Sequence, residues 1–382
     1  MKILAFTSIR SEYDLMSSLF FKLHEDPEVE LKLLVGGTHN SPSFGMTIED
    51  IISDGFDTLK VESLIDGDST SSRLKSASLL LISSIDMVQA FKPDLILYAG
   101  DREDVLVAAM LAGYLAIPSI HFFGGDHACD GHIDNPVRHA TSKLSTCHFV
   151  STSEHKQRLL ALGELESRIF NVGSVALDKF HEIEPDLSIP HKIAGAQISK
   201  PIALFIFHPV DTEVGVAAEI VTDVINELIN QGFYVFIGAP NSDYGNSGVR
   251  RAVAFYENHE DATVYGNLPR KAFVQLFKNA QVIIGNSSAG LLEAASIPIP
   301  CVNVGERQRG RFCGPNVQFV GTSKSEISAA IKKASSEDYL KSISEMVNPY
   351  GEGRSSEKAY KLIKNVDFLS MLKKKEDPLE NE

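Results

Sequence analysis

The sequence is poor in cysteine and lacks any long uninterrupted apolar run. Its four cysteines, Cys129, Cys147, Cys301 and Cys313, are separated by 18, 154 and 12 residues, so neither a CxxC metal knuckle nor a dense disulfide framework is expected. No run approaches about 18 apolar residues, and Ile3–Phe6 is too short for the core of a signal peptide. We therefore expect a cytoplasmic protein with reduced thiols and no membrane span.

Basic residues are outnumbered by acidic ones. The chain carries 36 Lys and Arg against 50 Asp and Glu, which gives a net charge of −14. A chain this acidic is a poor partner for nucleic acid or an anionic membrane, and neither is expected to bind. A small anion would need a locally positive site. Hydrophobic residues make up 43% of the chain, which is enough for ordinary buried cores.

Short apolar runs alternate with helix-period segments along the whole chain. Continuous runs such as DLILY (94–98) and IALFIF (202–207) are typical of parallel strands buried on both faces. The expected strands are Lys2–Thr7, Glu30–Val35, Asp94–Tyr98, Ser119–Phe123, His148–Ser151, Ile169–Val172, Ile202–Phe207, Tyr234–Ile237, Thr263–Tyr265, Val282–Ile284 and Cys301–Val304. The expected helices include Arg73–Ala90, Arg102–Leu115, Val216–Asn230 and Pro269–Asn279. This alternation predicts α/β doubly wound sheets.

A break separates these strands into two sets. Segment 181–200 holds two prolines and no clear period, and we interpret it as a linker. The sequence thus predicts two Rossmann-like doubly wound domains, 1–180 and 190–355, followed by a helix in 356–382 that packs back on the first domain and a frayed tail. A ligand is expected between the domains, at the carboxyl ends of the strands.

The strongest local signal is VIIGNSSAGLLEAAS at 282–296. A strand is expected to end at Gly285, and Ser287 and Ser288 lead into a helix whose free N–H groups would attract phosphate. Farther along, the carboxylate of Glu293 could accept two vicinal hydroxyls, such as those of a ribose. The alternative is that a serine only caps the helix and Glu293 is solvated.

Two further features belong to the second domain. Arg307, Arg309 and Arg311 crowd one loop, which in an acidic chain indicates contact with an anion, although a solvated loop is the simpler alternative. His208 directly follows the first strand of this domain, at the edge that would face the ligand. A lone histidine is, however, more often structural.

In the first domain, Arg10 follows the first strand, where a nucleotide-binding loop would lie. The surrounding TSIRSEYD (7–14) is not a GxGxxG motif, so a nicotinamide or flavin dinucleotide is not expected. Asp101 and Arg102 come just past a buried-type strand, and an acidic residue there is a catalytic candidate. Asp101 could equally serve as a helix cap.

A histidine- and aspartate-rich loop follows the strand that ends near residue 123. Segment 121–145 includes Asp126 and Asp134 among its acidic groups. Its spacings match no familiar zinc ligand set, so no metal is expected and acid–base chemistry is the better interpretation.

Taken together and in this order, these pieces resemble the UDP-N-acetylglucosamine 2-epimerase family, and in particular its hydrolysing branch, which serves sialic-acid-type sugar synthesis. The resemblance spans about residues 1–360. It is carried by THNSPSFGMT (38–47), GDR (100–102), DNPVRHATSKLSTCHFV (134–150), HPV (208–210), APNSDYG (239–245), GNSSAGLLE (285–293), GERQRGR (305–311) and NPYGEG (348–353).

The resemblance implies a glycosyltransferase-B-type architecture in which the second domain holds the UDP. Ser287 and Ser288 would meet phosphate, Glu293 the ribose, and Arg10 and Arg307 the diphosphate charge. The family's catalytic positions correspond to Asp101, Asp126, Asp134 and His208, and further substrate-binding positions to His39, Arg102 and Asn241.

The implied reaction is anti-elimination of UDP to a 2-acetamidoglucal, followed by addition of water with inversion at C2. It needs neither a cofactor nor a metal, and relatives suggest a homo-oligomer, a dimer or a tetramer. One residue departs from the family pattern, because Phe123 stands where a catalytic glutamate is usual, and the loop to Asp134 is two residues longer. Three alternatives therefore remain. The chain could catalyse the same chemistry on a UDP-diacetamido-trideoxyhexose, it could be a glycosyltransferase, or it could be a binding protein without catalysis.

Overall fold

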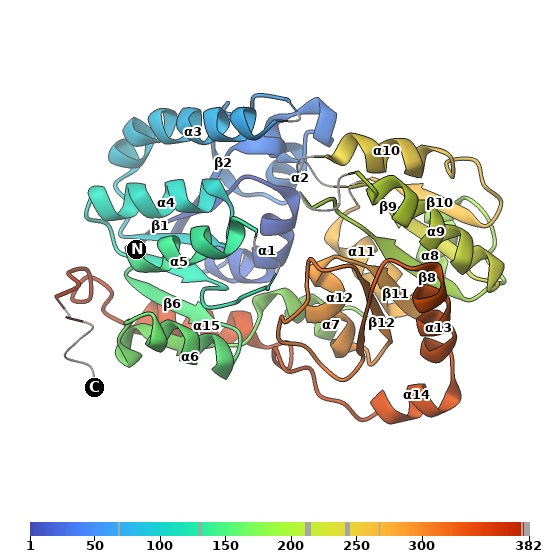
Figure 1. Ribbon diagram of the computed structural model, residues 1–382. Coiled ribbons are helices and arrows are strands. Elements are labelled where there is room, and N and C mark those ends of the chain that lie inside the picture. The colour runs from blue at the N-terminus through green and yellow to red at the C-terminus, as the bar shows by residue number, and fades with distance from the viewer. Residues whose placement is uncertain are drawn as a thin grey trace. The chain divides into compact units, whose positions relative to one another are not determined.

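The computed structural model describes residues 1–67, 69–129, 132–210, 215–240, 245–266, 268–375 and 377. They form two compact units. The first unit comprises residues 1–126 and 133–178 together with the chain from Gly353 onward, and the second comprises 179–352 together with the described part of 127–132 (Figure 1).

The first unit is built on a seven-stranded parallel sheet in the order β3-β2-β1-β4-β5-β6-β7. Its strands are β1 (Lys2–Thr7), β2 (Glu30–Val35), β3 (Asp57–Lys60), β4 (Leu95–Ala99), β5 (Ser119–Phe122), β6 (Cys147–Val150) and β7 (Ile169–Asn171). Its helices are α1 (Arg10–His24), α2 (Ile48–Ser53), α3 (Thr70–Phe91), α4 (Glu103–Tyr114), α5 (Asp134–Leu144), α6 (Ser153–Ala161) and α15 (Ser355–Asn365).

The second unit has a six-stranded parallel sheet in the order β10-β9-β8-β11-β12-β13. Its strands are β8 (Ile202–Ile206), β9 (Tyr234–Gly238), β10 (Ala262–Tyr265), β11 (Val282–Gly285), β12 (Cys301–Val304) and β13 (Val317–Val320). Its helices are α7 (Asp178–Glu182), α8 (Ser188–Ala194), α9 (Ala217–Asn230), α10 (Asn246–Ala254), α11 (Arg270–Asn279), α12 (Ser288–Leu292), α13 (Lys324–Ala334) and α14 (Glu337–Ile343).

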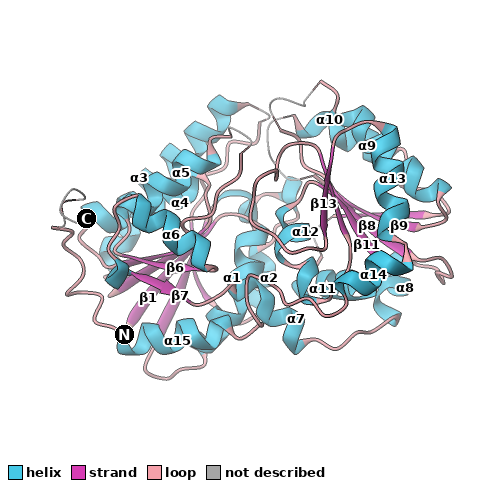
Figure 2. Cartoon of the chain, turned by 60° about the horizontal axis from the view of Figure 1, so that its bottom comes forward, coloured by secondary structure: helices cyan, strands magenta, loops and turns pink. Residues whose placement is uncertain are grey.

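Both faces of each sheet are covered by helices, as Figure 2 shows. In β1, Ile3 and Ala5 belong to one buried cluster, while Leu4 and Phe6 belong to another, because successive side chains of a strand point to opposite faces. This explains why the central strands read as continuous apolar runs. The predicted α/β doubly wound class is therefore confirmed.

Each expected strand is present with its ends within one residue of the prediction. Two strands were not predicted, β3 and β13, which lie at edges of the two sheets and are not fully buried. An edge strand that is only half-buried needs no continuous apolar run, and neither DTLK nor VQFV contains one.

The prediction of a linker over 181–200 is wrong, because this segment contains the helix α8. Pro190 lies in the first turn of α8, where its missing N–H costs no intrahelical hydrogen bond. Side-chain bonds from α11 also order the chain before α8. Gln275 accepts the N–H of Asp186 and donates to the carbonyl of Glu184, each at 2.7 Å.

The C-terminal helix α15 packs against α1 in the first unit. Ala359 and Ile363 are buried in the same cluster as the side chains of β1. The carboxylate of Asp178 accepts the backbone N–H groups of Ser355 and Ser356 at 3.0 and 2.8 Å, and so satisfies the free donors at the start of this helix.

Among the described residues, one helix is long and apolar enough to cross a bilayer by length and composition alone. This helix is α3, which has a mean hydropathy of 1.3 in its most apolar window, 22% of which is buried. Leu80, Val88 and Phe91 of this helix pack into a core cluster of the first unit.

Gly285, the last residue of β11, allows β11 to approach the neighbouring strand β8 at the carboxyl ends of the two strands. Its φ is +134°, and a Cβ atom there would lie 2.0 Å from the carbonyl oxygen of Ile206. We predict that Gly285→Ala lowers the free energy of unfolding of the second unit by about 2 kcal/mol or more, through backbone strain and overpacking. The measurement is urea denaturation followed by circular dichroism.

The matched control is Gly248→Ala in α10, where a Cβ atom would meet nothing within 4 Å. This change should raise stability by about 0.5–1 kcal/mol, because alanine favours a helix interior. Equal effects of the two substitutions would contradict the role given to Gly285.

Candidate active site

Strand order reverses at one place in each sheet. In the first unit this place lies between β1 and β4, and in the second between β8 and β11. The loops that follow such neighbouring strands run to opposite faces of the sheet and leave room for a ligand. Arg10 and Asp101 follow β1 and β4, while His208 and Ser287 follow β8 and β11. The topology therefore places four of the predicted site residues at the carboxyl ends of the strands where the order reverses, which we call the strand-reversal edges.

Asp101 is held by a buried arginine that the sequence analysis missed. The guanidinium of Arg138 in α5 contacts the Asp101 carboxylate and donates to the carbonyl of Asp126 at 3.0 Å and to Oδ1 of Asn135 at 3.1 Å. Arg138 is 3% exposed. The cap of α4 is Arg102, not Asp101, so the alternative of Asp101 as a helix cap does not hold. In the sequence, Arg138 is recognisable only as a single arginine about one helical turn after Asp134.

Asp126 lies just before segment 127–132, and Asp134 lies just after it. Asp126 is buried, and its Oδ1 lies 3.4 Å from Nε2 of the buried His155. Asp134 is the first residue of α5 and is partly exposed, and a carboxylate is favoured at a helix start. Of the two, only Asp134 presents its side chain to solvent to any extent.

The predicted anion-binding Arg10 already has carboxylate partners. It contacts Asp14 at 3.1 Å and also pairs with Asp50. Its side chain is 14% exposed. A bound diphosphate would have to exchange with at least one of these carboxylates.

Arg102 stands among acidic groups that the sequence analysis did not single out. It lies 3.9 Å from both Glu103 and Asp104. Burial raises the pKa of Asp104, and burial together with the charge of Asp104 raises the pKa of Glu12 well above its usual value. Glu12 Oε2 also accepts the backbone N–H of Ser8 at 2.8 Å. Two buried carboxyls that resist ionisation therefore lie at the β1–β4 edge.

His39 was expected to line the ligand site, but the structure buries it completely. Its Nε2 lies 2.9 Å from the hydroxyl of Thr7 and its Nδ1 lies 2.7 Å from the hydroxyl of Thr47. Burial lowers its pKa to about 3, so the ring is neutral. In this geometry His39 supports the loop after β1.

Asn286 organises the edge of the second unit and was not among the predicted site residues. Its side chain accepts the N–H of His208 and donates to the carbonyl of His208, both at 2.7 Å. Its own carbonyl accepts hydrogen bonds from Arg307 at 3.0 Å and Gln308 at 3.2 Å. One fully buried asparagine thus ties together the loops after β8, β11 and β12.

Ser287 and Ser288 begin the short helix α12. Ser287 Oγ accepts the N–H of Ala289 at 3.3 Å, so it caps this helix as the alternative interpretation supposed. Its hydroxyl hydrogen can still donate to a ligand, because a hydroxyl both accepts and donates. Both serines are partly exposed.

Glu293 is neither solvated nor free. It is 2% exposed, and both of its oxygens accept hydrogen bonds from the guanidinium of Arg270, at 3.1 and 3.3 Å. Burial raises its pKa, while Arg270 opposes that rise. Arg270 therefore holds the carboxylate in one orientation and leaves it further lone pairs for a ligand.

The described part of loop 127–132 belongs to the second unit. Cys129 donates its N–H to the carbonyl of Arg309 at 3.1 Å, and a Cβ atom on Gly310 would lie 2.5 Å from Cys129 Sγ. The loop that contains Cys129 is thus hydrogen-bonded to the loop that carries Arg307, Arg309 and Arg311. The predicted substrate-binding residue Asn241 lies outside the described residues.

Phe123, at the family's glutamate position, has a φ of +64°. It is partly buried and packs against the core of the first unit. A bulky residue in the left-handed region stores backbone strain, which is common near functional sites.

Within the described residues, no group of three His, Cys, Asp or Glu side chains could hold a metal ion.

Comparison with known proteins decides the family. Residues 21–364 match the family model described as UDP-N-acetylglucosamine 2-epimerase. The chain belongs to this family. It is 33% identical over 373 residues to "UDP-N,N'-diacetylbacillosamine 2-epimerase (hydrolyzing)" of Legionella pneumophila, a match that covers 97% of each chain. The resemblance to the hydrolysing branch is therefore confirmed, and the protein is an enzyme of this branch.

Two other relatives have similar coverage. "GDP/UDP-N,N'-diacetylbacillosamine 2-epimerase (hydrolyzing)" of Campylobacter jejuni is 30% identical over 88% of each chain. "Polysialic acid biosynthesis protein P7" of Escherichia coli is 30% identical, over 96% of this chain and 94% of the relative.

Solved structures support the fold. The UDP-GlcNAc 2-epimerase of Neisseria meningitidis, bound to UDP-GlcNAc, has a TM-score of 0.80 at 20% identity and covers 96% of this chain and 100% of its own. The enzyme of Methanocaldococcus jannaschii in complex with UDP-GlcNAc and UDP has a TM-score of 0.76 at 18% identity, with the same coverage. These similarities confirm the expected glycosyltransferase-B-type fold of two Rossmann-like units.

The buried Glu12 leads to a prediction about stability and pH. Because its folded-state pKa is raised, the stability of the wild type falls as the pH rises from the unfolded pKa through the folded one. Glu12→Gln removes this loss and keeps an oxygen for the N–H of Ser8. The substitution should therefore raise Tm relative to the wild type more at about pH 8 than at about pH 5.

The exposed Glu25, at the other end of α1, provides the control. Glu25→Gln should change Tm equally at both pH values. If the Glu12→Gln difference is the same at both pH values, or larger at the lower one, then Glu12 does not resist ionisation.

Proposed function

We propose that this enzyme is a hydrolysing 2-epimerase of a UDP-linked 2-acetamido sugar, which releases UDP and a free sugar inverted at C2. The observation that carries the proposal is the placement of acid–base candidates and anion-binding candidates at the two strand-reversal edges of a chain from the hydrolysing branch. Free manno-configured amino sugars of this kind feed nonulosonic acid or surface polysaccharide synthesis.

The first step would be anti-elimination. A carboxylate takes the proton from C2, the C1–O bond breaks, and its electron pair leaves with UDP to give a 2-acetamidoglucal. Asp101 and Asp134 are the candidates for the proton transfers, because both follow the first unit's strands and Asp101 is oriented by Arg138. In the second step water adds its oxygen to C1, and C2 receives a proton on the opposite face.

The second unit would hold the nucleotide. Ser287 and Ser288 can donate to phosphate, and Arg307, oriented by the carbonyl of Asn286, can offset its charge. His208 follows β8 at the same edge, so we assign it to the departing diphosphate. Arg10 and Arg102 would bind the substrate from the first unit.

The relatives favour a particular sugar. Two relatives, at 33% and 30% identity, are named for diacetylbacillosamine nucleotides, and another at 30% is named for polysialic acid biosynthesis. The Neisseria meningitidis relative named for UDP-N-acetylglucosamine is 26% identical. The apolar Phe123 in place of a glutamate is a further departure from the UDP-N-acetylglucosamine pattern. We therefore propose the UDP-diacetamido-trideoxyhexose as the preferred substrate over UDP-N-acetylglucosamine.

The test is proton NMR of the reaction with each sugar nucleotide in deuterium oxide. The proposal predicts free 2-epimerised sugar, UDP and deuterium at C2 of the product, with the higher kcat/KM for the diacetamido sugar. Release of the unepimerised sugar would instead indicate simple hydrolysis. Turnover only after an acceptor glycan or lipid is added would indicate a glycosyltransferase, and UDP binding without turnover a binding protein.

The catalytic assignment predicts that Asp101→Asn and His208→Ala each lower kcat at least about a hundredfold, as expected for acid–base groups. UDP affinity, measured by calorimetry, should change little for Asp101→Asn. The exposed Asp57 at the sheet edge is the control, and Asp57→Asn should keep the wild-type kcat. A near-normal kcat in either site variant would make that residue structural only.

The nucleotide assignment predicts that Glu293→Gln weakens UDP binding by about 1–3 kcal/mol, because a charge-assisted hydrogen bond to the ribose is lost. Thermal denaturation should accompany the calorimetry, since the change also leaves the buried Arg270 without its carboxylate. Unaltered UDP affinity in a folded variant would show that Glu293 serves only to hold Arg270.

A further inference from the structure

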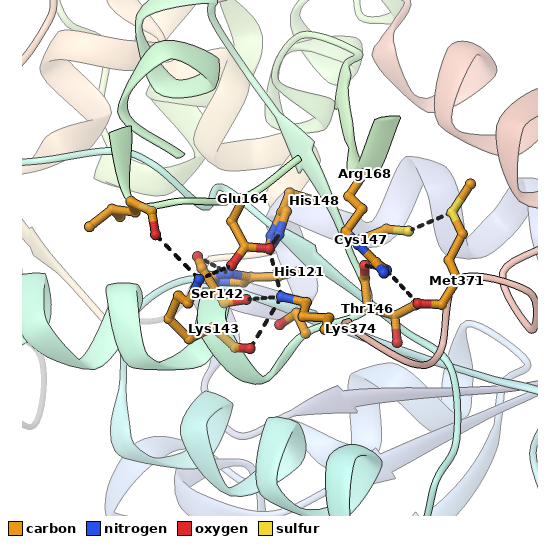
Figure 3. Close-up of polar contacts among 12 residues, drawn as sticks. His121, Ser142, Lys143, Thr146, Cys147, His148, Glu164, Arg168, Met371 and Lys374 are labelled. Atoms are coloured by element: carbon orange, nitrogen blue, oxygen red, sulfur yellow. Dashed lines mark hydrogen bonds and ion pairs between the residues drawn. The ribbon is translucent and has the colours of Figure 1, made fainter. Parts of the chain in front are cut away.

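A cluster of polar groups connects residues 366–375 to β6 and α5 within the first unit (Figure 3); its histidines, Glu164 and Arg168 are buried, whereas the side chains of Lys143 and Lys374 are 46% and 26% exposed. We call residues 366–375, which follow α15, the strap. Phe368 is buried in the same core cluster as Phe149 of β6. The guanidinium of Arg168, 5% exposed, donates to the strap carbonyls of Met371 and Lys373, the latter at 3.2 Å. These contacts hold the backbone of the strap in place.

Lys374 of the strap binds the end of α5. Its ammonium donates to the carbonyls of Ser142 and Lys143 at 3.3 and 3.2 Å. Both carbonyls lie in the last turn of α5, where carbonyls lack their usual partner one turn further along the helix, and that of Ser142 also accepts the N–H of the cap residue Ser145 at 3.2 Å. A cation at this end of a helix is also favoured by the helix dipole. Lys374 therefore caps α5 from a segment more than two hundred residues away in sequence.

Glu164 fixes the position of this ammonium. Its carboxylate is 1% exposed and accepts from Lys374 at 2.6 Å, Lys143 at 2.8 Å and His148 at 2.9 Å. Burial alone would raise the pKa of Glu164, but the hydrogen bond from His148 and the neighbouring cations outweigh it and lower the pKa to about 2. Burial lowers the pKa of His148 and also that of Lys374, and the Glu164 carboxylate opposes both shifts.

The same turn of α5 is connected to the loop that carries Asp101. The Ser142 hydroxyl lies 3.0 Å from Nδ1 of His121, and Nε2 of His121 lies 2.8 Å from the carbonyl oxygen of Gly100. A carbonyl only accepts, so Nε2 carries the hydrogen and Nδ1 accepts from Ser142. Burial lowers the pKa of His121 to about 3, which keeps the ring in this neutral state. Gly100 is the residue directly before Asp101.

A second connection runs through Arg138, which contacts the Asp101 carboxylate. Arg138 lies four residues before Ser142, so the two side chains share one face of α5 and both are buried. A rotation or shift of α5 would move both contacts to the loop at once.

We propose that Lys374 is a positioning residue for Asp101: by capping α5 it holds the helix whose Arg138 and Ser142 orient the Gly100–Asp101 loop. The proposal deepens the proposed function, because it rests on a catalytic role for Asp101.

The test compares Lys374→Met with Lys373→Met. Lys373 is exposed and contributes only its backbone carbonyl, so the control removes the same charge from the neighbouring position. Lys374→Met should lower kcat, counted per UDP-binding site from calorimetry, by about tenfold or more while KM changes less than about twofold. Lys374→Arg should restore at least about half of kcat, because it restores a cationic donor. A merely structural role would lower Tm and the number of binding sites but leave kcat per site unchanged.

A second readout does not depend on activity. Amide hydrogen exchange, followed by mass spectrometry on the ligand-free protein, should accelerate in Lys374→Met at segments 99–104 and 139–144, and should not accelerate in Lys373→Met. Unchanged exchange at 99–104 would overturn the inference, as would equal effects of the two substitutions or an unchanged kcat per site. If exchange is faster in Lys374→Met but the wild type shows no turnover, the result would support the positioning of the Gly100–Asp101 loop by Lys374 and contradict the proposed reaction.

Discussion

Reversal of strand order within a parallel sheet is the constraint on which the rest of this structure depends. Because the chain turns to opposite faces after β1 and β4, and again after β8 and β11, polar loops rather than packed helices occupy the carboxyl ends of these strands. Arg10, Asp101, His208 and Ser287 lie in or next to these loops. The remaining helices and strands hold the two pairs of loops in fixed positions on their sheets.

Buried guanidinium groups do much of that holding, in a chain whose net charge is strongly negative. Arg138, Arg168 and Arg270 are 3%, 5% and 9% exposed, and each meets a carboxylate or several carbonyls from different elements. A planar cation with several donors can join three segments at one point, which a lysine cannot do with the same directionality. Burial also means that removing such a cation leaves its partners unpaired, at a large cost in free energy.

The sequence predicted the fold class well, because buried parallel strands such as IALFIF leave a continuous apolar signal. It missed β3 and β13, which are partly exposed at sheet edges, and α8, whose Pro190 resembles a break although it occupies a tolerated first-turn position. The α3 helix was found as a helix, but its apolar content was masked by serines.

Site residues that follow directly after a strand, such as Asp101, His208 and Ser287, could be predicted from their position alone. Those whose role depends on a partner distant in sequence could not. Nothing in the local sequence links Arg138 to Asp101, Arg270 to Glu293, or Asn286 to the backbone of His208. For the same reason His39 was placed in the ligand site, whereas the fold encloses it between the hydroxyls of Thr7 and Thr47.

The division of the chain between the two units has a consequence for biosynthesis. The first unit contains both β1 and α15, so the core cluster that includes Ile3 and Ala5 of β1 is incomplete until Ala359 and Ile363 have been made. All six strands of the second unit precede those residues in the sequence. On a ribosome, the second unit therefore has its complete sheet before the first unit has its complete core. Until α15 emerges, the part of α1 that packs against it is left open to solvent or to whatever protects nascent chains.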